Sequence, residues 1–289
     1  MYNARIDQAA GLRRLCGGVP RQVVSVTAAS RGAGRTAFII GVALALAALG
    51  RRVLVIDENS GIGNVNDTLR LGLRYDLWHA LCDGRQWREV VQAAHPRINV
   101  LPAARAARMA DGVPHQTCAA VMAQIAATAD VVLVDALPES AGRGWEVEGE
   151  TRHWVLLPAG AVAVTAAYAL IKRITQSVTS SNRIEVVVSR VRNAAEGAAI
   201  HANLAGVARR YLQLTPALSG TWIADRAIAA LLRGGRALEA IDSDHRLLRH
   251  GASFASRLAG AATEGAVADA EPPFAGSMQP KMAAAWEAP

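Results

Sequence analysis

A short segment between two apolar runs carries the residue types that hold a phosphate group. Its residues are Gly32, Ala33, Gly34, Arg35 and Thr36. The two glycines have no Cβ, so the backbone can curl and its N–H groups can converge on an anion. Arg35 supplies a positive charge, and the hydroxyl of Thr36 is suited to Mg²⁺. The segment therefore predicts a phosphate-binding turn with a place for a metal ion.

Two carboxylates follow short apolar runs elsewhere in the chain. Asp57 follows the run Val53–Ile56, and Asp135 follows a run that ends at Val134. If both runs are strands of a parallel sheet, both carboxylates lie at its carboxyl edge, where α/β proteins place their ligands. We therefore expect Asp57 and Asp135 to lie near the phosphate-binding turn.

Apolar runs that alternate with helical patterns must position these groups. The turn lies between a strand near Val23–Thr27 and a helix that starts at Thr36 and stops at Gly50, a residue suited to a left-handed C-cap. Further strands are expected near Val53–Ile56, Ile98–Leu101, Asp130–Val134, Trp154–Leu157, Ile184–Val188 and Leu218–Ile223. Further helices are expected near Asp76–Cys82, Trp87–Ala94, Val113–Ala129, Thr165–Val178, Ala194–Leu212, Ala227–Leu232 and Ser243–Ala262. This alternation predicts an α/β fold with a mostly parallel sheet and helices on both faces.

The composition allows a large buried core and points to anionic partners. The chain has 289 residues, of which 52% are hydrophobic, and its formal net charge is +7. A basic chain attracts nucleic acid, membrane surfaces or acidic proteins, although an arginine-rich composition also arises from a GC-rich genome. No apolar run is long enough to span a bilayer, and the first residues lack a signal-peptide layout. We therefore expect a cytoplasmic protein.

The chain divides into three parts. Residues 1–20 form a leader, residues 21–262 the α/β domain, and residues 263–289 a flexible tail rich in Ala, Glu, Pro and Gly. Phe274, Met278, Met282 and Trp286 give this tail a weak apolar face. A membrane-seeking helix usually has a basic polar face as well, whereas the tail has one lysine and several acids. We therefore expect no more than weak, peripheral attachment at the inner membrane.

The unit around the turn resembles the deviant P-loop ATPases of the MinD/ParA class, whose loop has the pattern Lys-Gly-Gly-x-Gly-Lys-Thr. The corresponding residues here are Ser30, Arg31, Gly32, Ala33, Gly34, Arg35 and Thr36. Residues 43–81, 131–140, 167–172, 186–197 and 220–225 are similar to the FlhG/FleN branch, which regulates flagellar number. The resemblance covers roughly residues 5–260 and implies a P-loop NTPase-like fold. It implies ATP binding by Gly32, Ala33, Gly34, Arg35, Thr36, Asp57, Asp135 and Ser189, with Mg²⁺ near Thr36, Asp57 and Asp135.

The leader adds a second point of resemblance. Asp7-Gln8-Ala9-x-x-Leu12-Arg13 has the form of the N-terminal D-Q-A-x-x-L-R segment of FlhG. In that family the segment docks on the signal-recognition-type GTPase FlhF and stimulates GTP hydrolysis. The resemblance implies that Gln8 faces the GTP site of the partner, where a neutral amide can orient the attacking water. Asp7 would cap the peptide, and Leu12 and Arg13 would anchor it.

Several charged positions of the nucleotide site depart from the family pattern. The signature lysine, which crosses to the second subunit, corresponds to Ser30, and the P-loop lysine to Arg35. The second carboxylate of the family's Asp-x-Asp pair corresponds to Asn59, which can hydrogen-bond but cannot act as a base. Glu58 could be proposed as a stand-in for this carboxylate, but it should point to the side opposite its neighbours. The glycine-rich switch after Asp135 is replaced by residues 136–139, and Pro138 stiffens this segment. These changes predict weak or lost hydrolysis and argue against an ATP-dependent homodimer.

Three functions remain open from the sequence. The first is an FlhG-like regulator that binds an FlhF-like GTPase and also flagellar switch or transcription-regulator proteins. The second is an active ATPase whose cycle controls membrane attachment. The third is a ParA-like protein that binds DNA through its arginines. The leader favours the first over the third, so we do not expect nucleic acid to be the partner.

Overall fold

The computed structural model describes residues 21–109, 112, 114–141, 145, 147, 151–177, 183–223, 225–233 and 246–268. The expectations for Asp7, Gln8, Leu12 and Arg13 fall outside these residues and stay predictions. The division of the chain into leader, domain and tail also stays a prediction.

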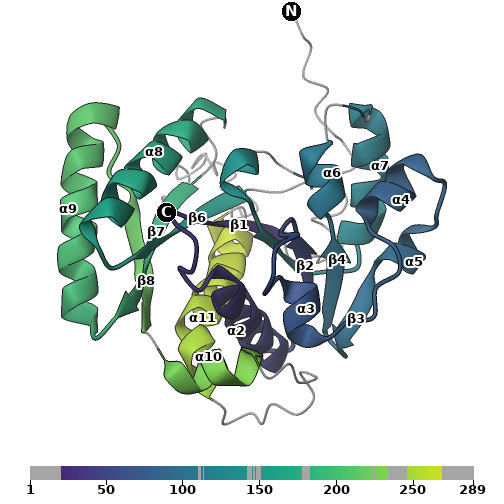
Figure 1. Cartoon of the computed structure of the whole chain (residues 1–289), viewed down its shortest axis with the longest axis horizontal. Helices are drawn as coiled ribbons and strands as arrows, with labels where there is room; N and C mark the ends of the chain where they lie inside the picture. The colour runs from purple at the N-terminus through teal and green to yellow at the C-terminus, as the bar shows by residue number, and fades with distance from the viewer. Residues whose placement is uncertain are drawn as a thin grey trace, which may run out of the picture.

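An eight-stranded sheet lies at the centre of the fold, in the order β3-β4-β2-β5-β1-β6-β7-β8 (Figure 1). The strands are β1 (Gln22–Ala28), β2 (Val53–Asp57), β3 (Gln92–His95), β4 (Ile98–Pro102), β5 (Val131–Asp135), β6 (Thr151–Pro158), β7 (Arg183–Val191) and β8 (Ala217–Ile223). The pairings are parallel apart from β3 with β4 at one edge. Every residue of β2 and β5 is buried, as expected for strands covered on both faces. The predicted fold class is confirmed.

Helices form a layer on each face of the sheet (Figure 1). One layer contains α2 (Arg35–Ala48), α3 (Val65–Leu69), α10 (Arg226–Arg233) and α11 (Arg246–Ala268). The other contains α4 (Leu77–Cys82), α5 (Trp87–Val90), α6 (Ala104–Arg108) and α7 (His115–Ala126), followed by α8 (Ala161–Ser177) and α9 (Ala194–Leu212). Within the described residues, no helix is both long and apolar enough to cross a membrane.

Helix α2 carries the phosphate-binding turn at its N-terminus and is fixed firmly in the core. Residues 38–47 are all buried, because α2 lies between the sheet and α11. Phe38 packs edge-on against Trp154, Trp222 and Phe254, with ring centroids 5.6, 5.2 and 4.9 Å away. Gly50 ends the helix with a φ of 78°, as its sequence position predicted. The start of α2 therefore has a rigid support.

Some local expectations were wrong. The helix predicted over Trp87–Ala94 ends at Val90, and residues 92–95 instead pair as the antiparallel edge strand β3. Pairing with β4 satisfies backbone groups that a helix would otherwise have satisfied, so tertiary context overrides the local pattern. The short helices α3 and α6 were not predicted. Helix α11, expected over Ser243–Ala262, runs from Arg246 to Ala268.

Candidate functional site

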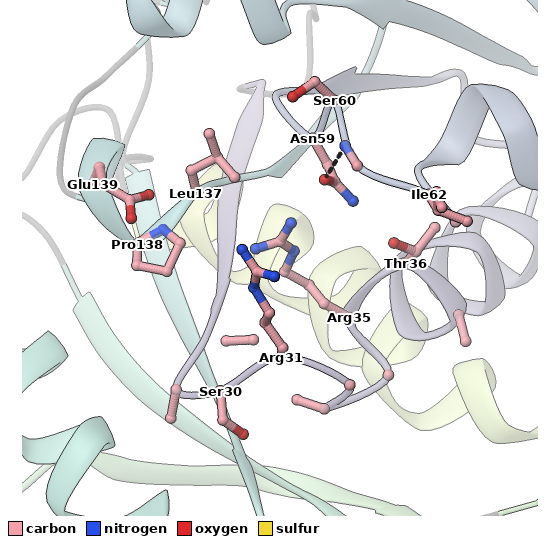
Figure 2. A pocket seen from close by; sticks show the side chains of 18 residues that line it. Ser30, Arg31, Arg35, Thr36, Asn59, Ser60, Ile62, Leu137, Pro138 and Glu139 are labelled. Atoms are coloured by element: carbon pink, nitrogen blue, oxygen red, sulfur yellow. Dashed lines mark hydrogen bonds between the residues drawn. The ribbon is translucent and has the colours of Figure 1, made fainter.

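A cavity of about 830 Å³ opens at the carboxyl edge of the sheet (Figure 2). It is lined by residues 28–37 between β1 and α2, residues 59–63 after β2 and residues 137–139 after β5. The sequence placed its candidate groups at this edge, and the structure brings the turn together with Asn59 and the segment after Asp135. This arrangement follows the general rule that open α/β sheets bind ligands beyond the carboxyl ends of their strands.

The turn itself forms a cradle of backbone amides. Gly32 and Gly34 have φ values of 73° and 86°, a left-handed conformation that glycine adopts without strain. In the described part of the chain, the N–H groups of residues 31–37 have no hydrogen-bond acceptor. Successive free N–H groups at a helix N-terminus attract an anion. The predicted phosphate-binding turn therefore has the backbone geometry that a phosphate requires.

Two side chains from the end of β7 hold this turn in place. The hydroxyl of Ser189 is fully buried and donates to the carbonyl of Ala33 at 3.0 Å. Nη1 of Arg190 donates to the carbonyl of Gly32 at 2.8 Å. Arg190 has a φ of 60°, a left-handed conformation at an irregularity in the β7–β8 pairing. Ser189, predicted to bind nucleotide, therefore contacts the cradle rather than lining the cavity.

Arg35 turns back towards the sheet and contacts a predicted metal ligand. Its Nε forms an ion pair with Oδ1 of Asp135, and its Nη1 donates to the carbonyl of Ala136 at 2.7 Å. The other oxygen of Asp135 accepts a hydrogen bond from the Thr36 hydroxyl at 3.2 Å. Burial raises the pKa of Asp135, and Arg35 and Thr36 oppose this shift by stabilising the carboxylate.

Asp57 is also engaged within the protein. Its carboxylate accepts the backbone N–H groups of Asn59, Val65 and Asn66 at 3.0, 2.8 and 3.4 Å. Val65 and Asn66 begin helix α3, so the carboxylate serves as an acceptor for the free amides of that helix. Burial raises the pKa of Asp57 to about 7, with a further contribution from the neighbouring charge of Asp135. The two carboxylates lie at paired positions of β2 and β5.

The residues expected to hold Mg²⁺ do not fit a metal ion in this arrangement. Thr36 donates to Asp135, both oxygens of Asp57 accept backbone N–H groups, and the guanidinium of Arg35 covers one oxygen of Asp135. A cation bound to Asp135 would lie beside this guanidinium. Two like unit charges about 4 Å apart repel by about 4 kcal/mol at an effective dielectric of about 20. The side chain of Arg35 thus takes the position at Asp135 that a cation would need.

Asn59 occupies the position that corresponds to the second carboxylate of the family's Asp-x-Asp pair. It lines the cavity, and its Oδ1 accepts the backbone N–H of Gly61 at 2.9 Å (Figure 2). A neutral amide cannot accept a proton from water, so Asn59 is not a general base. Its observed contact instead shapes the loop after β2.

Three charged side chains hold the segment after β5, which corresponds to the family's switch. Glu58 accepts hydrogen bonds from the backbone N–H of Leu137 at 2.8 Å, from the hydroxyl of Ser140 and from Nε1 of Trp145 at 2.7 Å. Nη1 of Arg173 on α8 donates to the carbonyl of Pro138 at 2.8 Å, and Arg35 holds Ala136.

Glu58 points away from the cavity, as the strand alternation predicted, but its partners were not foreseen. Burial raises the pKa of Glu58, and its three donors oppose this shift.

Arg31 is a cation at the cavity that the sequence interpretation missed. It is exposed, and its guanidinium points into the cavity beside Arg35 (Figure 2). The family pattern has a glycine at this position, so the resemblance indicated no charged group there. The signal was present, because Arg31 directly precedes Gly32 in the turn.

Comparisons with known proteins add an independent line of evidence. A family model described as cellulose biosynthesis protein BcsQ matches residues 22–151. The antiactivator FleN of Pseudomonas aeruginosa is 30% identical in an alignment over 226 residues that covers 76% of this chain and 79% of that protein.

Solved structures share the fold at lower identity. The cell division protein MinD of Aquifex aeolicus aligns with a TM-score of 0.63 and 17% identity, covering 83% of this chain and 97% of that one. The septum site-determining protein MinD of Pyrococcus horikoshii, solved with Mg-ADP, aligns with a TM-score of 0.61 and 14% identity over 84% of this chain and 98% of that one.

Proposed function

This chain belongs to the FlhG/FleN branch of the MinD/ParA family, and from that membership we propose that it regulates flagellar number and placement through partner proteins rather than through turnover of ATP. The P-loop domain would then be a scaffold with weak or lost hydrolysis. The leader, residues 1–20, would be the segment that activates a partner.

The observation that supports this proposal most is the contact of Arg35 with Asp135. In phosphoryl transfer the protein contributes mainly positioned charges, so each misplaced charge slows the reaction by orders of magnitude. Here the cation of the turn is directed at a carboxylate, Asn59 has replaced a carboxylate, and Ser30 has replaced a lysine. We infer that the site does not support efficient hydrolysis.

The fixation of the segment after β5 points in the same direction. Nucleotide switches work when a loop is ordered by the γ-phosphate and released after hydrolysis. In this protein Arg35, Glu58 and Arg173 hold residues 136–140 from three parts of the fold. A loop held in this way favours a domain that keeps one conformation over a nucleotide-dependent switch.

Two classes of partner follow from the family. The Asp7-Gln8-Ala9-x-x-Leu12-Arg13 segment supports an FlhF-like GTPase as the first, with Gln8 as the residue that orients water at its GTP site. FleN is described as an antiactivator, which supports a transcription activator of flagellar genes or a component of the flagellar switch as the second. The protein would act in the cytoplasm, with at most peripheral attachment to the inner membrane.

The decisive experiment measures GTP hydrolysis by an FlhF-like GTPase with and without the full-length protein. We expect the wild type to stimulate GTP hydrolysis. Gln8→Ala should stimulate it at least about tenfold less, because the amide that orients the water is gone. Asn3→Ala, in the same leader but outside the motif, is the matched control and should stimulate like the wild type. Equal stimulation by Gln8→Ala and the wild type would refute the proposed mechanism.

Two further measurements separate the alternatives. ATP hydrolysis should not exceed that of Thr36→Ala, whereas turnover that depends on Thr36 would favour an active ATPase. The protein should not be retained on DNA at moderate salt, because incidental binding through a few phosphate contacts weakens steeply as salt rises. Retention on DNA at about 0.2 M salt would favour the partition-protein alternative.

A further inference from the structure

Several guanidinium groups border the cavity, and that of Arg35 is already paired with Asp135. Among the described residues that line it, the charged side chains are Arg31, Arg35 and Glu139. Arg190 contacts the turn through the carbonyl of Gly32, and Nη1 of Arg108 donates to the hydroxyl of Ser60 at 2.6 Å on the loop after β2. Four guanidinium groups thus lie in or beside a cavity whose floor is a cradle of free backbone amides. This combination is suited to a ligand with several negative charges.

The same cavity disfavours a divalent cation. The carboxylate of Asp135 is neutralised by Arg35, and its second oxygen receives the Thr36 hydroxyl. Asp57 has both oxygens occupied by backbone N–H groups. In a usual P-loop site the metal neutralises part of the phosphate charge. Here a fixed guanidinium lies where the metal would meet the protein, and Arg31 adds a second cation beside it.

A smaller cavity adjoins the same turn and offers a different surface. It has a volume of about 220 Å³, and residues Gly32, Ala33, Gly34 and Ala37 line both cavities. Its other lining residues are three apolar ones, Trp222, Ile223 and Ile228, and three charged ones, Arg190, Asp225 and Arg226. An aromatic ring and aliphatic side chains beside a phosphate cradle are suited to the flat, weakly polar face of a base.

We propose that the two cavities bind a nucleoside triphosphate as the metal-free anion, with the guanidinium of Arg35 in the place of the divalent cation. This proposal rests on the proposed function in that the nucleotide is held and not turned over. The phosphates contact the amides of residues 31–37 and the guanidinium of Arg31. Mg²⁺ competes with the arginines for the phosphate oxygens and therefore weakens binding.

The test is calorimetric titration of the full-length protein with ATP, in one buffer with excess EDTA and in another with excess Mg²⁺. We expect the Kd to be about threefold to tenfold lower in EDTA, as charged contacts to the phosphates are no longer shared with the metal. A Kd that is equal in the two buffers, or lower with Mg²⁺, would overturn the proposal. Absence of ATP binding in both buffers would overturn it too.

Variants identify the responsible side chains. Arg35→Lys replaces a planar fork by a compact charge that is not suited to hold Asp135 in the same way, so we expect Mg²⁺ to strengthen ATP binding in this variant. Arg31→Ala should weaken binding about fivefold to tenfold in both buffers, because one phosphate contact is lost. Arg88→Lys, on α5 and outside both cavities, is the control and should bind like the wild type. An Arg35→Lys variant that keeps the wild-type response to Mg²⁺ would contradict the role of Arg35.

Inorganic triphosphate tests the contribution of the base. We expect it to bind at least about tenfold more weakly than ATP in EDTA, since it cannot occupy the smaller cavity. Equal affinity would overturn the assignment of a nucleoside. Failure of ATP binding with intact, Gln8-dependent GTPase stimulation would refute only this inference. Metal-free ATP binding without any such stimulation would instead refute the proposed function.

Discussion

Glu58 and Trp145 are hydrogen-bonded inside the protein, with the indole Nε1 donating to Oε1 of Glu58 at 2.7 Å. Glu58 is buried and also accepts the backbone N–H of Leu137 and the hydroxyl of Ser140. One carboxylate therefore ties the end of β2 to the segment after β5. Glu58 directly follows Asp57, so adjacent side chains hold two different segments: Asp57 accepts the first backbone amides of α3, and Glu58 holds the segment after β5.

Glu58→Ala should lower the free energy of unfolding by roughly 2–4 kcal/mol, because three donors lose their acceptor inside the protein. Urea denaturation followed by tryptophan fluorescence measures this change. Glu139→Ala is the matched control, since Glu139 is exposed in the same segment, and it should stay within about 0.5 kcal/mol of the wild type. If both variants had the stability of the wild type, Glu58 would not anchor this segment.

The packing of α11 on α2 leads to a second prediction. A Cβ on Gly251 would lie 2.2 Å from the carbonyl oxygen of Gly41, so the backbones of the two helices touch at this point. Gly251→Ala must push the helices apart and should destabilise the protein by about 2–4 kcal/mol, as overpacking against a rigid backbone does.

Gly260 provides the control for this prediction within the same helix. A Cβ on Gly260 has no neighbour within 4 Å, so Gly260→Ala should stabilise the protein by about 0.5–1 kcal/mol through helix propensity. Denaturant unfolding of both variants gives the two values. Equal effects of the two substitutions would show that the close approach of Gly251 to Gly41 does not govern the docking of α11.

The sequence predicted the sheet well because its central strands are short, continuous apolar runs. Val53–Ile56 is buried on both faces, and such a run has few alternatives to a central parallel strand. The edge strand β3 could not be predicted in this way, since residues 92–95 are half exposed and their pairing depends on β4 being beside them. The short helices α3 and α6 likewise depend on the loops around the cavity.

The site was predictable in its backbone and less so in its side chains. The turn, Asp57, Asn59 and Asp135 could be placed at one edge because each follows a predicted strand, and the carboxyl ends of parallel strands share an edge. The contact of Arg35 with Asp135 could not be predicted in the same way, because a long side chain can reach several groups and the local geometry decides which one it contacts. Glu58 contacts Leu137, Ser140 and Trp145, which are 79, 82 and 87 residues away in the sequence. No local pattern could have indicated these contacts.

His153 makes stability depend on pH. It is buried in β6, neither ring nitrogen has a partner within the described residues, and burial lowers its pKa to about 4. Between the ordinary value of about 6.5 and this lower value, the unfolded chain binds the proton and the folded chain does not, so stability falls as pH falls. His153 alone should lower the free energy of unfolding by about 3 kcal/mol as the pH falls through this range. Asp57 acts in the opposite direction, because its raised pKa makes the folded state bind more protons from about pH 4 to 7.

His153→Leu separates these contributions. The difference in unfolding free energy between this variant and the wild type should grow in favour of the variant as the pH is lowered from about 6.5 to 4. Ile174→Val, in the core on the same face of the sheet, is the control: it lowers stability without changing a titrating group, so its difference from the wild type should be the same at each pH. A pH-independent difference for His153→Leu would mean that this histidine does not resist protonation in the fold.

Restoring the family's charges should restore hydrolysis if their loss is what suppresses it. The combined variant Ser30→Lys, Arg35→Lys and Asn59→Asp returns the crossing lysine, the P-loop lysine and the second carboxylate, while the amide cradle, Thr36 and Asp135 are already present. Because each preorganised group contributes about 10²–10³ in rate, we expect hydrolysis at least about 100-fold faster than in the wild type, measured as phosphate release with Mg²⁺. Adding Thr36→Ala to this variant should abolish the gain. Asn59→Asp alone should gain little hydrolysis, since Arg35 still contacts Asp135. Full activity from that single change would show that the missing carboxylate, and not the position of Arg35, limits hydrolysis in the wild type.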